Sequence, residues 1–145
     1  MNDFCISLPG SYFLVGRSFT GPNASEIIRI NDYGDTIWNK FYPSISHITS
    51  CASDSNGNSV IMGEGGNWRA KIDPNGNILW KINSDKVDVR ISNITKSTDN
   101  GYISCGNETN SSGNGYIMKF DSVGNFLWQS TFPAGFFMAF RSIIN

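Results

Sequence analysis

The chain repeats one pattern three times, and this repeat constrains the possible fold more than any other feature of the sequence. Each copy has an apolar strand that ends at a glycine, a strand that carries one basic residue, and a turn followed by a strand that ends at a tryptophan. In every copy, five positions separate the basic residue from the turn glycine, and four separate that glycine from the tryptophan. The copies are Tyr12–Gly16 with Arg29 and Gly34–Trp38, Ser59–Gly63 with Lys71 and Gly76–Trp80, and Tyr102–Gly106 with Lys119 and Gly124–Trp128.

Each copy is predicted to form four antiparallel strands. The stretch between one tryptophan and the next strand glycine carries one further predicted strand, Ser46–Ser50 or Ile91–Ser97. Asp73 and Asp121 begin turns in which the carboxylate can accept hydrogen bonds from backbone amides while the glycine takes a positive φ, and Asn31 has the same place in the first copy. The sequence therefore predicts a single repeat domain over 1–145, with units at 1–43, 44–88 and 89–133 and one extra strand at 134–145.

Composition supports a structure made of strands and excludes two classes of function. Gly, Asn and Ser are abundant, which favours short strands joined by tight turns. Charged residues make up 16% of the chain and the formal net charge is −1, so we predict no nucleic-acid binding. No stretch reaches the roughly 20 apolar residues that cross a bilayer, and Met1–Ser7 lacks the pattern of a signal peptide. We therefore predict no membrane span, while the compartment stays open.

The repeats resemble those of a bacterial β-propeller family whose units run Gly-Tyr-Ile-x-x-Gly and then Lys-x-Asp-x-x-Gly-Asn-x-Leu-Trp. The best matching segments are Asp99–Ile103 and Lys119–Trp128, and Asp73–Trp80 and Asp121–Trp128 also look like the tryptophan-docking repeat of quinoprotein-like propellers. The resemblance implies propeller blades and an extracellular or cell-surface location. It implies little about function, because this fold hosts enzymes, lectins, scaffolds and receptors. No residues match those that hold a quinone, so no cofactor is predicted.

The predicted fold class is all-β, with three four-stranded antiparallel propeller blades plus the extra C-terminal strand. A propeller ring has about four to eight blades, so three blades alone would leave apolar sheet faces exposed. We therefore predict self-association, as a homodimer that completes a ring, or completion by the remainder of a longer protein. A β-trefoil or β-prism is the alternative, because three repeats of four strands also suit these closed folds.

The copies differ in length in one loop, between the strand glycine and the basic residue. Such loops usually lie on one face, where ligand binding is expected. These variable loops are Arg17–Ser25, Glu64–Trp68 and Asn107–Gly115. Aromatic and amide side chains in or beside them are the candidate residues for binding a glycan or a protein: Phe19, Asn67, Trp68, Asn107 and Tyr116. Trp68 and Tyr116 could equally be strand residues in the core.

The recurring basic residues Arg29, Lys71 and Lys119 lie on one face of their strands. One interpretation is that each forms a structural pair with a carboxylate or carbonyl on an adjacent strand or blade. The other is that they form a ring of cations around a central channel that could hold an anion.

Catalytic chemistry finds little support in the sequence. His47 is the only histidine and is predicted to lie in a strand, and Cys105 aligns with apolar residues, which indicates a buried thiol. Cys5, Cys51 and Cys105 are odd in number and lack Cys-x-x-Cys spacing, so neither a disulfide framework nor a zinc site is indicated and no metal site is predicted, while the redox state of the three thiols stays open. The expected function is a non-catalytic binding or assembly module and not an enzyme. The alternative is a hydrolase whose site forms only in a completed ring.

Overall fold

The computed structural model describes residues 3–17, 25–45, 47–64, 68–83, 89–109 and 113–133, which form twelve strands in three antiparallel sheets of four. The first sheet contains β1 (Asp3–Leu8), β2 (Ser11–Arg17), β3 (Ser25–Asn31) and β4 (Thr36–Tyr42). The second contains β5 (Ile48–Ser53), β6 (Ser59–Gly63), β7 (Trp68–Ile72) and β8 (Ile78–Asn83). The third contains β9 (Val89–Lys96), β10 (Tyr102–Glu108), β11 (Gly115–Phe120) and β12 (Phe126–Phe132). The predicted all-β fold of three four-stranded units is confirmed.

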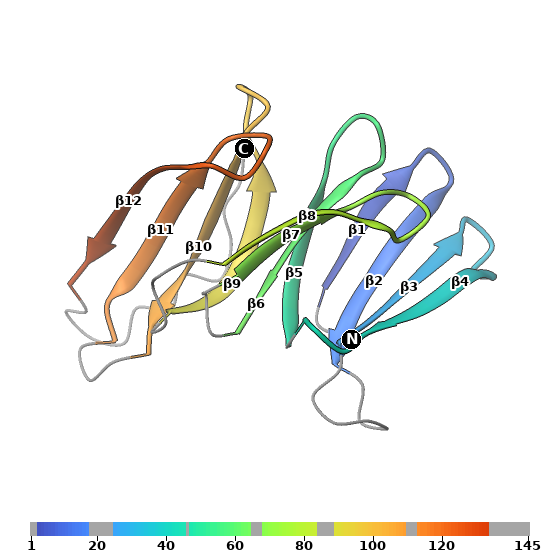
Figure 1. Ribbon diagram of the computed structural model, residues 1–145, viewed down its shortest axis with the longest axis horizontal. Coiled ribbons are helices and arrows are strands. Elements are labelled where there is room, and N and C mark those ends of the chain that lie inside the picture. Colours follow the sequence, from blue (N-terminus) through green and yellow to red (C-terminus); the bar gives the residue numbers. More distant parts are fainter. Residues whose placement is uncertain are drawn as a thin grey trace.

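The three sheets stand side by side like the blades of a propeller, and the second sheet lies between the other two (Figure 1). Within each sheet the strands follow one another in chain order. The sheets contact one another mainly through their first strands, since β1 contacts β5 and β5 contacts β9. We call the sheets the first, second and third blades, the strands β1, β5 and β9 the inner strands, and the strands β4, β8 and β12 the outer strands.

One five-residue turn, with the same hydrogen bonds, joins the third strand to the outer strand in every blade. In the β7–β8 turn, the Asp73 carboxylate accepts hydrogen bonds from the backbone amides of Asn75 and Asn77. Asp121 and Asn31 accept the equivalent bonds in the other two turns. The φ angle of the turn glycine is positive in each case, at 83° for Gly34, 76° for Gly76 and 90° for Gly124. These are the turns that the sequence predicts, and glycine occupies them because its φ is not restricted by a Cβ.

Two hydrophobic cores lie between the blades. Phe13 and Ile61 belong to the core between the first and second blades, whereas Val60, Met62 and Phe120 belong to the core between the second and third. Neighbouring residues on a strand point to opposite faces, so β6 sends Ile61 into one core and Val60 and Met62 into the other. The second blade is therefore covered on both faces.

The structure changes some of the predicted boundaries. The inner strand of the second blade begins at Ile48 rather than at residue 46, and His47 lies outside it with a φ of 45°. The extra strand predicted at 134–145 lies outside the described residues. Over the described ranges, no helix has the length and apolar character that crossing a membrane requires.

Candidate binding surfaces

A groove of about 510 Å³ lies where the inner strands of the three blades end. One wall comes from the end of β1 with Leu8 and Pro9, and another from the end of β5 and the turn that follows it, with Ser53 and Ser55. The end of β9 completes the lining with Thr95 and its neighbours. Since every blade contributes to it, the groove exists only because the blades pack in this order.

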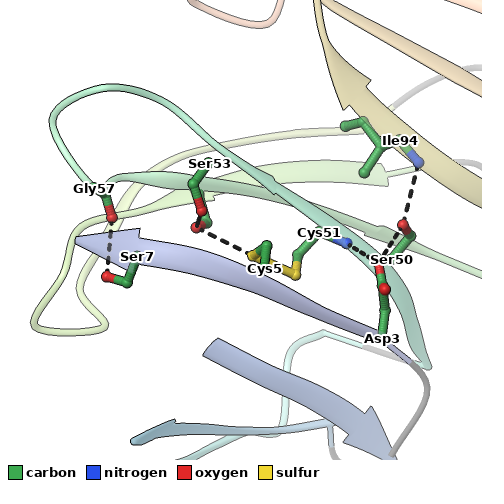
Figure 2. Close-up of a disulfide and its surroundings, with 9 residues drawn as sticks. Asp3, Cys5, Ser7, Ser50, Cys51, Ser53, Gly57 and Ile94 are labelled. Carbon is green, nitrogen blue, oxygen red and sulfur yellow. Dashed lines mark hydrogen bonds between the residues drawn. A yellow bond between two sulfur atoms is a disulfide. The ribbon is translucent and has the colours of Figure 1, made fainter. Parts of the chain in front are cut away.

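Hydrogen bonds hold the inner strands in line near this groove (Figure 2). The Asp3 carboxylate on β1 accepts hydrogen bonds from the Ser50 hydroxyl at 2.7 Å and from the Cys51 amide at 3.0 Å. The Ser50 hydroxyl in turn accepts a hydrogen bond from the Ile94 amide on β9 at 3.1 Å. Ser50 is fully buried, so its hydroxyl needs these partners. One short row of polar groups thus connects all three blades.

A disulfide joins Cys5 on β1 to Cys51 on β5, with the two Cα atoms 6.0 Å apart (Figure 2). The odd cysteine count and the lack of Cys-x-x-Cys spacing do not indicate this bond, and it settles a redox state that the sequence leaves open. The odd cysteine count arises because Cys105 is the one left free; it is buried, and burial raises the pKa of its thiol. The bonded cysteines are separated by 46 positions, close to one repeat length, and this spacing places them on neighbouring inner strands. This spacing was the feature of the sequence from which the disulfide could have been predicted.

The outer strand of the first blade contacts the β7–β8 turn of the second blade. The Trp38 indole donates a hydrogen bond to the Pro74 carbonyl at 3.0 Å, and the Tyr42 hydroxyl donates to the Gly76 carbonyl at 2.7 Å. Gly76 is buried, and a Cβ at this position would lie 2.8 Å from the Tyr42 oxygen and 2.9 Å from the Trp38 ring. Burial, together with the charge of Asp73, raises the pKa of Tyr42 to about 12. We call this arrangement of an outer-strand tryptophan over a turn glycine the docking contact.

The docking contact recurs between the second and third blades. Gly124 in the β11–β12 turn is buried, and a Cβ there would lie 2.7 Å from Ile82 Cδ1 and 2.9 Å from the Trp80 ring. Arg69 on β7 donates a hydrogen bond to the Gly124 carbonyl at 2.7 Å, and its guanidinium lies 5.4 Å from the centre of the Phe120 ring. The same sequence motif therefore forms the docking contact twice within one chain.

The third tryptophan and the first turn glycine differ from these two pairs. Trp128 lies opposite Lys119 in the sheet register, just as Trp38 lies opposite Arg29, yet it is 46% exposed. Gly34 is exposed, and a Cβ there would meet nothing within 4 Å. Exposed large apolar side chains gather on the same two blades: Phe4, Ile6, Tyr33, Ile37 and Phe41 on the first, and Val123, Phe126, Leu127, Trp128 and Phe132 on the third. Among the described residues, the second blade exposes only Ile78 and Leu79 in this way.

The three recurring cations lie in three different blades, and the structure does not bring them together. Each is on the third strand of its blade, and the second strand separates it from the inner strand. Each contacts the region of the turn that joins the first two strands of its own blade. The pairs are Arg29 Nη2 with Ser11 Oγ at 2.9 Å, Lys71 Nζ with Asp54 Oδ2 at 2.8 Å, and Lys119 Nζ with Asp99 Oδ1 at 2.6 Å. Arg29 also donates a hydrogen bond to the Pro74 carbonyl of the second blade at 3.0 Å, so each of the three cations has a carboxylate or carbonyl partner.

The five candidate residues of the variable loops lie in different parts of the structure. Phe19 and Asn67 lie outside the described residues. Trp68 is 4% exposed in the first core and Tyr116 is 1% exposed in the second, so both rings are covered by a neighbouring blade. Asn107 lies on β10, where it is paired with Arg90 on β9 and Gly115 on β11. A hollow of about 110 Å³ does lie at the loop end of the first blade, between β2 and β3.

His47, Glu64 and Arg90 form a polar cluster that the sequence did not predict. The His47 Nδ1 atom lies 3.0 Å from Glu64 Oε2, and Arg90 forms an ion pair with the other oxygen of the same carboxylate. Burial acts to raise the pKa of Glu64, but the charges and hydrogen bonds of Arg90 and His47 outweigh it and lower that pKa. The other ring nitrogen of His47 is buried and shielded from solvent, and it has no hydrogen-bond partner among the described residues. Gly63 allows the close approach of the His47 backbone, since a Cβ there would lie 1.9 Å from the His47 carbonyl oxygen, but Gly16 and Gly106 hold the same place in the other copies and so gave no signal for the cluster.

Across the ranges that the structure describes, no group of three or more His, Cys, Asp or Glu side chains is placed to hold a metal ion.

Comparison with known proteins identifies the fold and no family. No family model matches the sequence, and no curated protein matches it significantly. A protein of unknown function from Bacteroides caccae matches 88% of this chain with a TM-score of 0.61 and 20% identity, and the match covers 43% of that protein. The WD40 domain of Pan2 from Neurospora crassa matches 79% of this chain with a TM-score of 0.57 and 16% identity, and the match covers 35% of that domain. The chain therefore has a β-propeller-type fold and spans less than half of each solved structure.

Proposed function

We propose that the chain is a non-catalytic binding module that binds an extended segment of another protein in the groove at the ends of the inner strands. The observation that carries this proposal is that one concave surface of about 510 Å³ is built from all three blades. This volume is in the range of about 300–1,000 Å³ typical of ligand sites. Because the blades are tied together by the disulfide and by the Ser50 hydrogen bonds, the groove is preorganised.

The lining suits a polypeptide because it combines apolar surface with hydrogen-bonding groups. Leu8 and Pro9 offer apolar contacts, whereas the hydroxyls of Ser55 and Thr95 can exchange hydrogen bonds with a peptide backbone. Burial acts to raise the pKa of Asp54, but hydrogen bonds from Lys71 and from neighbouring groups outweigh it and lower the pKa. Asp54 is therefore ionised at neutral pH, and its charge is paired with that of Lys71 at 2.8 Å.

A random-sequence peptide library displayed against the immobilised chain, followed by titration of the selected peptides, tests this proposal. Ser55→Arg and Thr95→Arg should abolish binding, because each fills part of the groove. The matched control is Ser122→Arg, which has the same place in the β11–β12 turn as Ser55 has in the β5–β6 turn and lies outside the groove. Peptides that bind all three variants with unchanged affinity would contradict a groove site.

The variable loops are the second candidate for the ligand face, with a glycan or a protein as ligand. The hollow of about 110 Å³ beside β2 and β3 favours this candidate. Saturable sugar binding on a glycan array that survives Ser55→Arg and Thr95→Arg would favour the loops over the groove.

The absence of enzymatic activity and the compartment belong to the same proposal. The His47 Nε2 atom is shielded from solvent, which supports a structural role for the His47–Glu64–Arg90 cluster rather than proton transfer to a substrate. The Cys5–Cys51 disulfide supports a function outside the reducing cytosol. Turnover in a broad hydrolase screen that His47→Ala removes would contradict the non-catalytic part of the proposal.

A further inference from the structure

We propose that two copies of this chain associate head to tail, with the Gly34 turn of each copy docked under Trp128 of the other, so that six blades close into one ring. This inference concerns different surfaces from the groove and does not depend on peptide binding. It rests on the docking contact, which the chain forms twice within itself and whose two halves are both exposed elsewhere, at Gly34 in the first blade and at Trp128 in the third.

The exposed Gly34 turn and the exposed Trp128 correspond to the two parts of the docking contact. Gly76 and Gly124 are buried under Trp38 and Trp80, whereas Gly34 is exposed with nothing within 4 Å of a Cβ. The Gly34 turn nevertheless has the same length, the same positive φ and the same backbone hydrogen bonds as the two docked turns. It is therefore preformed for a contact that no described part of its own chain makes.

Trp128 offers the complementary surface. It occupies the same register position on its outer strand as the two tryptophans that are docked, and Phe132 stands where Tyr42 stands on the first blade. Trp128 is 46% exposed, whereas Trp38 and Trp80 are partly buried and packed against the cores between the blades. A large aromatic ring that is exposed at a position otherwise packed between blades marks an interaction surface.

The inner strand of the first blade supports the same arrangement. Phe4, Cys51 and Ile94 hold equivalent places on the three inner strands. In the sheet register they lie opposite Leu14, Ile61 and Ser104, which occupy the same position in the apolar strand of each copy. Cys51 and Ile94 face the preceding blade and are each 4% exposed, whereas Phe4 is 61% exposed. Among the described residues, no blade covers the first blade at Phe4 on its inner strand or at its outer turn.

The number of blades selects two copies. Propeller rings have about four to eight blades, so two copies give an allowed ring of six, and three copies would give nine. In a ring of two, each copy uses both of its open faces, and no edge is left for growth into a fibre. Head-to-tail closure therefore accounts for both exposed faces with a single type of contact.

Sedimentation velocity over a dilution series tests the proposal with two substitutions and two matched controls. Trp128→Ala and Gly34→Asn should each raise the dissociation constant of the dimer by at least about tenfold, because a docked tryptophan is a central anchor and an Asn side chain would occupy its place. Asn tolerates the positive φ of Gly34, so the turn itself is retained. The controls are Phe126→Ala, which is 51% exposed and lies opposite Phe120 in the register, on the other face of β12 from Trp128, and Gly113→Asn, at another positive-φ glycine with open space; both should associate like the wild type.

Mixing the two variants gives the most specific result. Each variant alone has both of its contacts damaged, but a mixed pair regains one intact contact, between Trp128 of the Gly34→Asn chain and Gly34 of the Trp128→Ala chain. The mixture should therefore associate more tightly than either variant alone. A mixture no tighter than its components, or a wild-type chain that stays monomeric, would overturn the proposal. Neither outcome affects groove binding, which is measured separately with the selected peptides and should persist in Trp128→Ala.

Discussion

Replacing the turn glycines by alanine tests whether docking, and not turn geometry alone, requires glycine. Gly34 and Gly76 both have a positive φ, so either substitution should cost about 1–2 kcal/mol of unfolding free energy for forcing an L-residue into the left-handed region. At Gly34 nothing else opposes the Cβ, because the surrounding space is open. At Gly76 the Cβ would lie 2.8 Å from the Tyr42 oxygen and 2.9 Å from the Trp38 ring.

Those two side chains cannot move aside without losing bonds of their own. Trp38 donates to Pro74 at 3.0 Å and Tyr42 donates to Gly76 itself at 2.7 Å. Overpacking of this kind costs about a further 1–3 kcal/mol, so Gly76→Ala should lower the free energy of unfolding by about 2–5 kcal/mol in total. The same alanine at Gly34 therefore serves as an internal control for the turn.

Urea unfolding followed by far-ultraviolet circular dichroism measures the difference. The chain should be dilute enough that the midpoint no longer depends on its concentration, so that association does not contribute. We expect Gly76→Ala and Gly124→Ala to be clearly more destabilising than Gly34→Ala, with similar slopes in urea. Equal losses at the three positions would show that docking does not require glycine, because turn geometry would then account for the whole effect.

Three further predictions concern stability. Replacing Cys5 and Cys51 together by alanine removes a cross-link over 46 positions and should lower the free energy of unfolding by up to about 4 kcal/mol; a reducing agent should then shift the urea midpoint of the wild type but not of the variant. Hydrogen bonds from Lys119 and Ser97 hold the pKa of Asp99 well below its usual range. The stability from this pairing is therefore present above about pH 4 and is lost as the pH falls further, and Asp99→Asn should lower the melting temperature at neutral pH and weaken its decline in acid. Arg69→Met leaves the Gly124 carbonyl without its donor and should cost about 1–3 kcal/mol in urea unfolding.

Most of the fold could be predicted from the sequence repeat, because each strand and turn of the repeat has a local physical cause. The carboxylate or amide at Asp73, Asp121 and Asn31 fixes a turn through hydrogen bonds that span only a few residues. Apolar residues on both faces of a strand, as in β6, require neighbours on both sides, which the propeller arrangement supplies. These features are encoded within one repeat and are visible without knowledge of the rest of the chain.

Features that depend on contacts between blades were harder to predict. The sequence motif is the same at Trp38, Trp80 and Trp128, yet only the last of the three is left exposed, because burial depends on whether another blade follows. Trp68 and Tyr116 were candidates for ligand binding, and their strands instead turn them into the two cores. Local sequence gives a residue's place on a strand, whereas its exposure is decided by the neighbouring sheet.

The cluster of His47, Glu64 and Arg90 also depends on contacts that the sequence does not predict. His47 and Glu64 meet because Gly63 permits the close approach of the backbone around His47, whose φ of 45° no strand pattern predicts. Arg90 joins them from β9, in the next blade. Only the packing of two blades brings these three side chains together.

The closed ring of two copies is best tested by the absolute mass of the wild-type chain in solution, measured by light scattering after size-exclusion chromatography over a range of concentrations. We expect a discrete species of twice the 16.0 kDa chain mass that gives way to the single chain on dilution. A single chain at every concentration would contradict it, since the Trp128 face and the Gly34 turn would then be stable without the docking contact. Masses that rise continuously beyond the pair would also contradict the closed ring of six blades.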